Sequence, residues 1–244
     1  MSLAEVMALL EAEGSEQTRK TYRRHEAEDP MFGVSFAFLK TLTKRIDVDH
    51  ELAHQLWNTG NFDARNLAVK IVDPAQMKPA DLDRWVQETS VSRMCGGYAA
   101  MLASEGPHGA QKAVQWQASI NTKERAAAWT LLGQLAQRDE ALPDSFFLGR
   151  LSEIERTIHT AENDHRAGMN NALISIGLRN SALRTAAIAS ARKIGKVDID
   201  HGDTSCKTPD AEASIEKTWA YSTAKGFSSP AAAERERDVP RRRC

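Results

Sequence analysis

Apolar side chains recur along almost the whole chain at intervals of three and four residues, with no convincing run of period-2 alternation. This pattern predicts amphipathic helices separated by short connections that contain glycine or proline. Before Gly195 we expect helices over residues 2–13, 15–27, 35–46, 48–59, 61–72, 79–89, 91–104, 107–118, 121–137, 144–160, 163–178 and 180–194.

Small polar residues precede several of these helices and predict where they begin. Ser35, Asn61 and Asp144 each stand before an apolar run, and Asn121 with Glu124 has the spacing of a capping box. About a dozen short helices joined by tight turns are typical of an α-solenoid of stacked HEAT-like helix pairs. We therefore expect an all-α solenoid, with a compact helical bundle as the alternative.

The character of the sequence changes after Gly195. We expect a HEAT-like helical repeat domain over residues 1–195, a loop and capping helix of the same domain over 196–226, and a disordered tail over 227–244. Within the second segment, residues 209–224 predict a last helix that packs Ile215, Trp219 and Tyr221 onto the array. The tail is poor in apolar residues and rich in arginine, which favours a solvated segment over one that touches a polyanion weakly.

Charge and composition restrict the classes of function. The chain has 244 residues, with 32 basic and 33 acidic side chains and a formal net charge of −1. Binding by indiscriminate attraction to polyanions is therefore excluded, and any contact with nucleic acid must depend on where the charges lie. Three cysteines without paired spacing indicate free thiols in a reducing compartment. With no signal peptide and no membrane-spanning apolar run, we expect a cytoplasmic monomer with no membrane partner.

Arginine recurs near the start of the predicted helices. A helix N-terminus disfavours a cation, yet Arg125 lies at the head of an apolar stripe. Free N–H groups beside a guanidinium form a site that suits phosphate. We therefore predict DNA-backbone contacts, against the alternative of surface ion pairs or solvated side chains, for Arg65, Arg93, Lys123, Arg125, Arg166 and Arg184. The stretch "RKTYRRH" at 19–25 adds a basic helix face, for which solvation is the alternative.

Other candidate chemistry is weaker. The chain has no glycine-rich phosphate loop, nucleophile elbow or dinucleotide fingerprint, so kinase, hydrolase and dehydrogenase activities have no support. The stretch "DIDHGDTSCKTPD" at 198–210 holds acidic residues, a histidine and a cysteine but no standard metal spacing, so we expect a capped loop, no metal and no cofactor. Asn170 and Asn171 either contact a nucleotide or are buried amides. Core packing is expected of Trp57, Trp85, Trp116 and Trp129.

Several stretches together resemble the DNA alkylation repair family of HEAT-like glycosylases. They are "YRRHEAEDPMFGVSFAFLKTLTKRI", "HQLWNTGNFDARNLAVKIV", "NTKERAAAWTLLGQL", "IHTAENDHRAGMNNALISIG" and "IGKVDIDHGDTSCKTPDA", in that order over roughly residues 15–200. The resemblance implies a curved stack of helix pairs whose concave face holds alkylated duplex DNA. It also implies excision of N3- and N7-alkylated purines by hydrolysis of the N-glycosidic bond.

The resemblance carries over to the site residues only in part. Arg125 matches the family's catalytic-site arginine, which holds a phosphate near the lesion. The family's first tryptophan and its aspartate correspond to Ser92 and Gly96, and its second tryptophan to Leu173. The stretch from Ser90 to Ala103 contains neither Trp nor Asp, so the competing hypothesis is a non-catalytic helical-repeat module that binds DNA or a protein. Carboxylates that could substitute for the aspartate are Glu88, Glu124 and Asp164.

Overall fold

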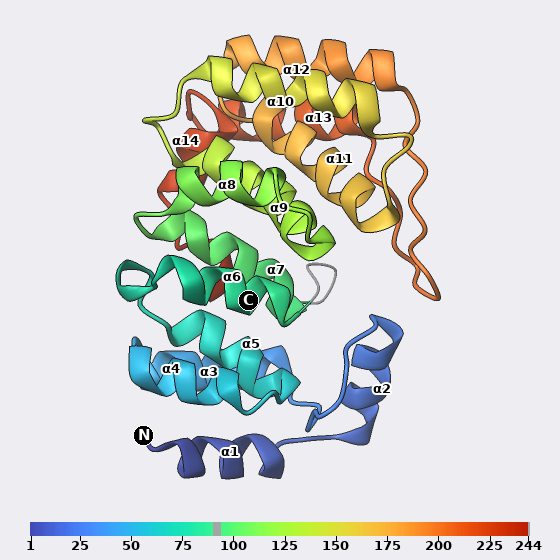
Figure 1. Ribbon diagram of the computed structural model, residues 1–244. Coiled ribbons are helices and arrows are strands. Elements are labelled where there is room, and N and C mark those ends of the chain that lie inside the picture. Colours follow the sequence, from blue (N-terminus) through green and yellow to red (C-terminus); the bar gives the residue numbers. More distant parts are fainter. Residues whose placement is uncertain (90–93, 244) are drawn as a thin grey trace. The chain divides into compact units, whose positions relative to one another are not determined.

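The computed structural model describes residues 1–89 and 94–243, and every regular element within them is helical (Figure 1). The α-helices are α1 (Leu3–Ala12), α2 (Glu16–Arg24), α3 (Phe36–Ile46), α4 (His50–Asn58), α5 (Phe62–Ile71), α6 (Pro79–Gln87), α7 (Met94–Leu102), α8 (Gly109–Gln117), α9 (Thr122–Arg138), α10 (Asp144–Thr157), α11 (Asn163–Gly177), α12 (Ser181–Ile194), α13 (Ala211–Ala224), α14 (Pro230–Arg235) and α15 (Pro240–Arg243). Short 3-10 helices η1 (Pro74–Gln76) and η2 (Ala103–Glu105) complete the list. The all-α prediction is confirmed.

The polar residues expected at helix starts act as caps in most cases. The side chains of Ser35, Asn61 and Asn121 accept hydrogen bonds from backbone N–H groups of the first turns of α3, α5 and α9. The prediction for Asp144 is wrong, because Pro143 occupies the N-cap position of α10. The Asp144 carboxylate is engaged elsewhere, since both of its oxygens accept from the side-chain amide of Asn180 at 3.0 Å.

The chain divides into two compact units, each with its own core. Unit 1 contains residues 1–107, 202–204 and 239–244, and unit 2 contains residues 108–201 and 205–238. In unit 1, α5 packs against α1, α3, α4 and α7. Burial extends almost all round α5, from Phe62 to Ile71, and includes polar side chains such as Asp63 and Lys70. An element buried on all sides needs internal partners for its polar groups, and unit 1 supplies them for Asp63 and Lys70.

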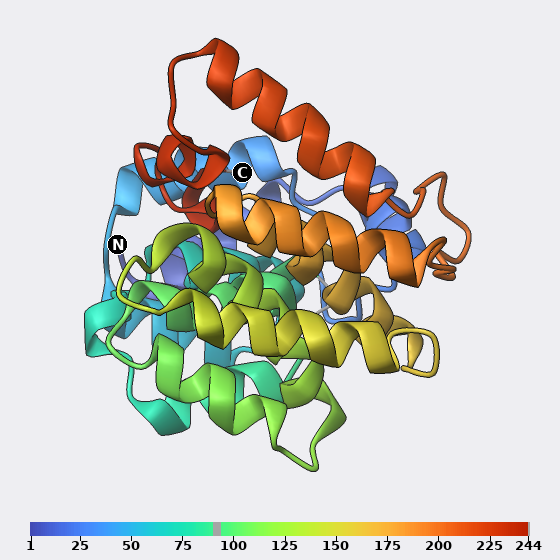
Figure 2. The ribbon, with the colours of Figure 1, turned by 90° about the horizontal axis from the view of Figure 1, so that it is seen from above.

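Helix α9 is the centre of unit 2 and packs against α8, α11 and α14. A Cβ atom added at Gly168 of α11 would lie 2.9 Å from the Cβ of Trp129. The absence of a side chain at this position therefore allows α11 to approach α9 closely. Helix α12 packs against α10, α11 and α13, and Figure 2 shows α10, α12 and α13 as neighbouring helices.

The last part of the chain departs from the expectation for residues 196–244. Helix α13 buries Ile215 and Trp219, as expected, but Tyr221 is 62% exposed because it lies on the opposite face. Residues 227–244, expected to be disordered, contain α14 and α15, and Arg241 is only 3% exposed. Specific buried contacts of this arginine within unit 1 hold α15, and α14 packs against α9 and α13 in unit 2.

Among the described helices, none combines the length and the apolar character that a membrane crossing requires.

Candidate nucleic-acid interface

Arg125 lies in the first turn of α9 and partly braces the loop that precedes it. Its Nη1 donates to the carbonyl oxygens of Ser119 at 2.9 Å and Ile120 at 3.1 Å. Its Nε and Nη2 donate to no described residue, and no described carboxylate pairs with it. One edge of the guanidinium therefore stabilises the loop, while two nitrogens keep N–H groups available to an anion.

Two further contacts hold the same loop, which connects α8 to α9. Asn121 N donates to Ser119 Oγ at 3.0 Å, and His165 Nε2 of α11 donates to the carbonyl oxygen of Thr122 at 2.9 Å. Ile120, between these braced residues, is 97% exposed. The loop thus presents an apolar side chain beside a partly unpaired arginine in a fixed backbone conformation. The sequence indicated the arginine but carried no signal for the exposure of Ile120 or the contact from His165.

Arg65, in contrast, has a hydrogen-bond partner within unit 1 for each of its three guanidinium nitrogens. Its Nε donates to the carbonyl oxygen of Trp57 at 3.3 Å, its Nη1 to that of Glu88 at 3.2 Å, and its Nη2 to the Glu88 carboxylate at 3.2 Å. The guanidinium carbon lies 4.9 Å from the centre of the Trp57 ring, a cation–π distance. These contacts link α4, α5 and the end of α6, so Arg65 has a structural role here.

Arg166 and Arg184 also have internal partners. Arg166 donates from Nη1 to the carbonyl oxygen of Asp198 at 2.6 Å and from Nη2 to that of Ala161 at 2.9 Å, while its Nε is buried. Arg184 forms an ion pair with Glu216 and lies over the ring of Trp219. Arg166 therefore anchors the loop after α12, and Arg184 ties α12 to α13.

Of the two remaining predicted residues, Lys123 and Arg93, the structure describes only the first. Lys123 is exposed in the first turn of α9, two residues before Arg125, and its backbone N–H donates to the Asn121 side chain at 2.9 Å. Arg93 lies outside the described residues. Unit 2 thus places Lys123 and Arg125 on one helix start, whereas Arg65 belongs to unit 1.

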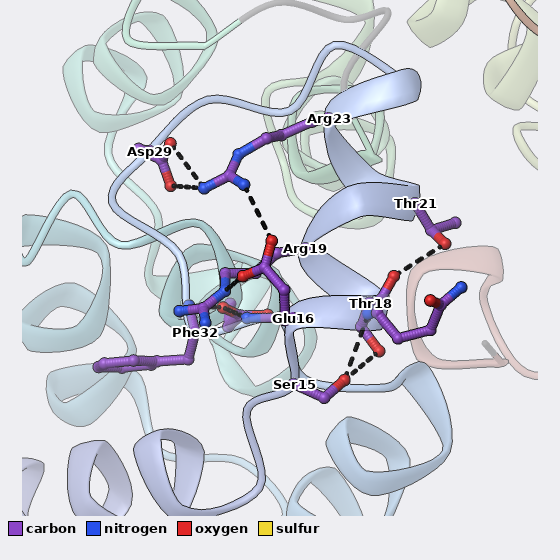
Figure 3. A network of polar contacts seen from close by, with 11 residues as sticks. Ser15, Glu16, Thr18, Arg19, Thr21, Arg23, Asp29 and Phe32 are labelled. Carbon is purple, nitrogen blue, oxygen red and sulfur yellow. Dashed lines mark hydrogen bonds and ion pairs between the residues drawn. The ribbon is translucent and has the colours of Figure 1, made fainter.

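The basic face of α2 is partly neutralised by neighbouring acids (Figure 3). Arg19 Nε donates to Glu16 at 2.8 Å, and Arg23 pairs with Glu16 at 3.6 Å and Asp29 at 3.2 Å. Lys20 is exposed and has no described partner. Exposed pairs of this kind contribute about 0–1 kcal/mol each, so α2 is mainly a solvated basic helix.

Comparison with known proteins identifies the family. A family model described as "DNA alkylation repair enzyme" matches residues 6–214 of this chain. The chain belongs to the DNA alkylation repair family. The match confirms the resemblance carried by the stretches between residues 15 and 200.

Alignments with three similar proteins cover most of this chain. It is 28% identical over 215 residues to the uncharacterized protein Lin0241 of Listeria innocua and 27% identical to the uncharacterized protein Lmo0209 of Listeria monocytogenes. Each alignment covers 85% of this chain and 93% of the relative. A solved structure shares 29% identity and a TM-score of 0.79, covering 93% of this chain and 96% of the other. That structure represents "a new family of proteins related to the HEAT-like repeat DNA glycosylases with affinity for branched DNA structures".

The positions that correspond to the DNA alkylation repair family's aromatic and acidic residues are only partly visible. Ser92 lies outside the described residues, Gly96 lies in α7, and Leu173 is 1% exposed within α11. The tryptophans expected in the core are there: Trp57, Trp85, Trp116 and Trp129 are at most 3% exposed. None of these four indoles is exposed for base contact.

The three carboxylates proposed to replace the family aspartate have different surroundings. Glu88 accepts from Nε1 of Trp57 at 2.5 Å and from Arg65, so its oxygens are engaged in unit 1. Glu124 is 6% exposed in the first turn of α9, directly before Arg125 in the chain. Asp164 lies in the first turn of α11, where its charge complements the helix dipole. Of the three, Glu124 is the nearest in sequence to the braced loop.

Segment 198–210 is an irregular loop with internal contacts. His201 Nε2 lies 3.1 Å from Thr208 Oγ1, and Asp210 caps α13 by accepting from Ala213 N at 2.8 Å. Within the described part of the chain, no three His, Cys, Asp or Glu side chains are grouped so as to hold a metal ion. Asn170 is 2% exposed and donates to the carbonyl oxygen of Pro209 at 3.0 Å, whereas Asn171 is exposed.

Proposed function

We propose that this protein binds alkylated or branched duplex DNA, as a cytoplasmic monomer, and that Arg125 contacts a backbone phosphate. The observation that carries the proposal is the state of the Arg125 guanidinium, which combines a fixed position with two unpaired nitrogens. Membership of the DNA alkylation repair family and the branched-DNA affinity of the 29% identical relative support DNA as the ligand.

The braced loop suits such a contact physically. Because Arg125, Asn121 and His165 already hold its backbone, binding costs little further ordering. Exposed apolar side chains of this size are used elsewhere to wedge between bases, most easily where stacking is already interrupted. Ile120, at 97% exposure, gives the loop such a side chain. A branch point or a damaged step is the kind of DNA at which this wedge costs least.

Binding without excision is the form of the proposal that the residues favour. The stretch Ser90–Ala103, which corresponds to the family's first tryptophan and aspartate, contains neither residue type. Excision of N3- and N7-alkylated purines is the second candidate, favoured by the family description as a repair enzyme. A carboxylate near the sugar would then stabilise its developing positive charge, and Glu124 is the candidate for this role.

The first experiment measures binding to three DNA molecules: a methylated duplex, a four-way junction and a matched unmodified duplex. We expect Arg125→Ala to weaken binding to the preferred DNA by about tenfold, the value of a charge-assisted hydrogen bond. Arg156→Ala is the matched control, because Arg156 is an exposed arginine of α10 and removes the same charge. Equal losses from both variants would leave only general electrostatics and contradict a specific role for Arg125.

The second experiment separates binding from excision. Methylated DNA is incubated with excess protein, and released 3-methyladenine and 7-methylguanine are quantified. We expect no release above the spontaneous rate, together with binding in the first experiment. If methylated bases are released, and Glu124→Gln abolishes the release but not the binding, the result supports excision instead.

A further inference from the structure

Unit 2 contains a half-open cavity of about 650 Å³ between the end of α12, the loop after it and the start of α13. A volume of this size falls within the range of sites that hold small molecules. Its lining includes the apolar side chains of Leu173, Ile194 and Val197 and the segment Lys207–Glu212. Nothing in the DNA-binding proposal uses this cavity.

A buried amide lines the cavity with unused hydrogen-bonding capacity. Asn170 is 2% exposed, and its only hydrogen bond with a described residue runs from Nδ2 to the carbonyl oxygen of Pro209 at 3.0 Å. Its Oδ1 and its second Nδ2 hydrogen therefore have no partner. The free Oδ1 is not fully buried and is reachable from the cavity, so a ligand that donates and accepts side by side would complement this amide.

The start of α13, which also lines the cavity, offers anion-binding groups. The backbone N–H groups of Ala211 and Glu212, in the first turn of the 14-residue helix α13, have no described acceptor. Lys196 and Lys207 also line the cavity, are exposed, and have no described partner. A helix N-terminus and two ammonium groups that line the same cavity are suited to a phosphate.

Two of the three acidic side chains around the cavity already have internal partners. Glu212 pairs with Arg192, with Arg192 Nη2 2.6 Å from Glu212 Oε1, and Asp210 caps α13 by accepting from Ala213 N. The Asp198 carboxylate has no described partner. A carboxylate in such a position can accept a hydrogen bond from a sugar hydroxyl.

We propose that this cavity is a binding site for an adenine nucleotide, taken either as a free mononucleotide or as an unpaired adenosine of a nucleic acid. The base lies against the apolar side chains of the lining with its exocyclic amine and N7 on the amide of Asn170, the pairing that asparagine makes with adenine. The phosphate lies at the start of α13 beside Lys196 and Lys207. The free-nucleotide form of this inference does not depend on the proposed function.

The test is calorimetric titration of the full chain with AMP, adenosine and IMP. We expect micromolar binding of AMP, weaker binding of adenosine because it lacks the phosphate, and weaker binding of IMP because a carbonyl replaces the amine. Asn170→Leu should weaken AMP binding by about tenfold or more. The matched control is Asn171→Ala, an exposed amide one residue further along α11. No saturation by AMP below about millimolar concentration would overturn the inference.

Two further variants keep the test decisive if Asn170→Leu does not fold. Ala191→Phe fills the cavity from α12 and should abolish AMP binding. Lys196→Glu with Lys207→Glu should weaken AMP but not adenosine, and Lys217→Glu, on the exposed face of α13, should change neither. Equal loss of AMP and adenosine in the double variant would contradict the phosphate assignment.

A competition arm distinguishes the two sources of the nucleotide. A DNA hairpin with one bulged deoxyadenosine should displace AMP if the site reads an unpaired base in DNA, whereas a fully paired hairpin should not. AMP binding without such competition identifies the free nucleotide. Retained junction binding with no AMP binding refutes this inference alone, and the reverse result refutes the proposed function alone.

Discussion

Asp63 shows how much a single buried carboxylate organises at the residue scale. It is fully buried in α5 and accepts hydrogen bonds from the backbone N–H groups of Phe32 at 2.6 Å, Gly33 at 3.0 Å and Val34 at 2.9 Å. Three consecutive N–H groups of the segment that connects α2 to α3 are therefore satisfied by one side chain.

We expect Asp63→Ala to lower the free energy of unfolding by about 3 kcal/mol or more, because three buried N–H groups lose their acceptor. Urea denaturation measures the change. Asp49→Ala is the control, since Asp49 accepts a single N–H, that of Leu52 at 3.0 Å, as the N-cap of α4, and removing such a cap costs about 1 kcal/mol. Losses of similar size from both variants would contradict the role given to Asp63.

His54 lies in a row of aromatic rings in unit 1. Its ring centroid is 4.6 Å from that of His50 and 5.3 Å from that of Trp85, which stacks on Trp57 at 4.1 Å. Burial lowers the pKa of His54, and the nearby His50 and Arg84 lower it further, against the opposing effect of Asp81 and Glu51. The neutral ring is therefore the form that fits the folded state.

This lowered pKa predicts the sign of a pH effect. As the pH falls below about 6.5, the unfolded chain takes up a proton at His54 before the folded chain does, so the free energy of unfolding decreases. We expect His54→Leu to flatten this decrease between about pH 7.5 and pH 5 in urea melts at each pH. Gln55→Leu, which replaces an exposed side chain that does not titrate, on the same helix, should leave the slope unchanged. An unaltered slope in the His54 variant would refute the assignment.

At the scale of elements, α15 is held by side-chain contacts and not by its own helical propensity. A helix of four residues does not form by itself. Arg241 Nε donates to Glu105 at 2.5 Å and its Nη1 to the carbonyl oxygen of Val69 at 2.6 Å, while Lys70 Nζ donates to the carbonyl oxygen of Arg241 at 2.7 Å. The Lys70 ammonium also lies 4.2 Å from the centre of the Tyr98 ring.

Breaking the buried pair of Arg241 and Glu105 should be costly. We expect Arg241→Ala to lower the free energy of unfolding by about 3 kcal/mol, since the guanidinium no longer faces the buried carboxylate. The neighbouring Arg242→Ala is a close control, because Arg242 pairs with Asp47 at 2.7 Å where Asp47 is 76% exposed, and such a pair contributes about 0–1 kcal/mol. Chemical denaturation that finds equal effects would mean that the α15 contacts do not stabilise unit 1.

Elements also show why site prediction from sequence was incomplete. Arg125 was predicted from its place at the start of an amphipathic helix, and its partners, Ser119 and Ile120, lie in the loop directly before it. Arg65 looked equivalent, yet it pairs with Glu88, 23 residues away, once α4, α5 and α6 are packed together. Local spacing identifies a helix start with an arginine, but only the packing of neighbouring helices decides whether a carboxylate neutralises it.

For the whole molecule, a formal net charge of −1 means that attraction to DNA has to come from local cations. We expect the logarithm of the DNA-binding constant to fall with the logarithm of salt concentration, with a slope of about −0.9 for each phosphate contacted. Arg125→Ala should reduce the magnitude of that slope by about one, and Arg156→Ala should not. Fluorescence anisotropy between low and physiological salt measures both, and a flat dependence would exclude phosphate contacts.

The sequence alone determined the all-α architecture, the helix positions and the buried tryptophans, because helical periodicity and capping act within a few residues. It also indicated the family, through the order of several stretches along the chain. The tertiary structure alone decided which arginines are neutralised, that Arg241 orders the last helix, and that Asn170 faces a cavity with an unused amide oxygen. These features depend on groups that are distant in the chain and meet only when helices pack, so no local pattern encodes them.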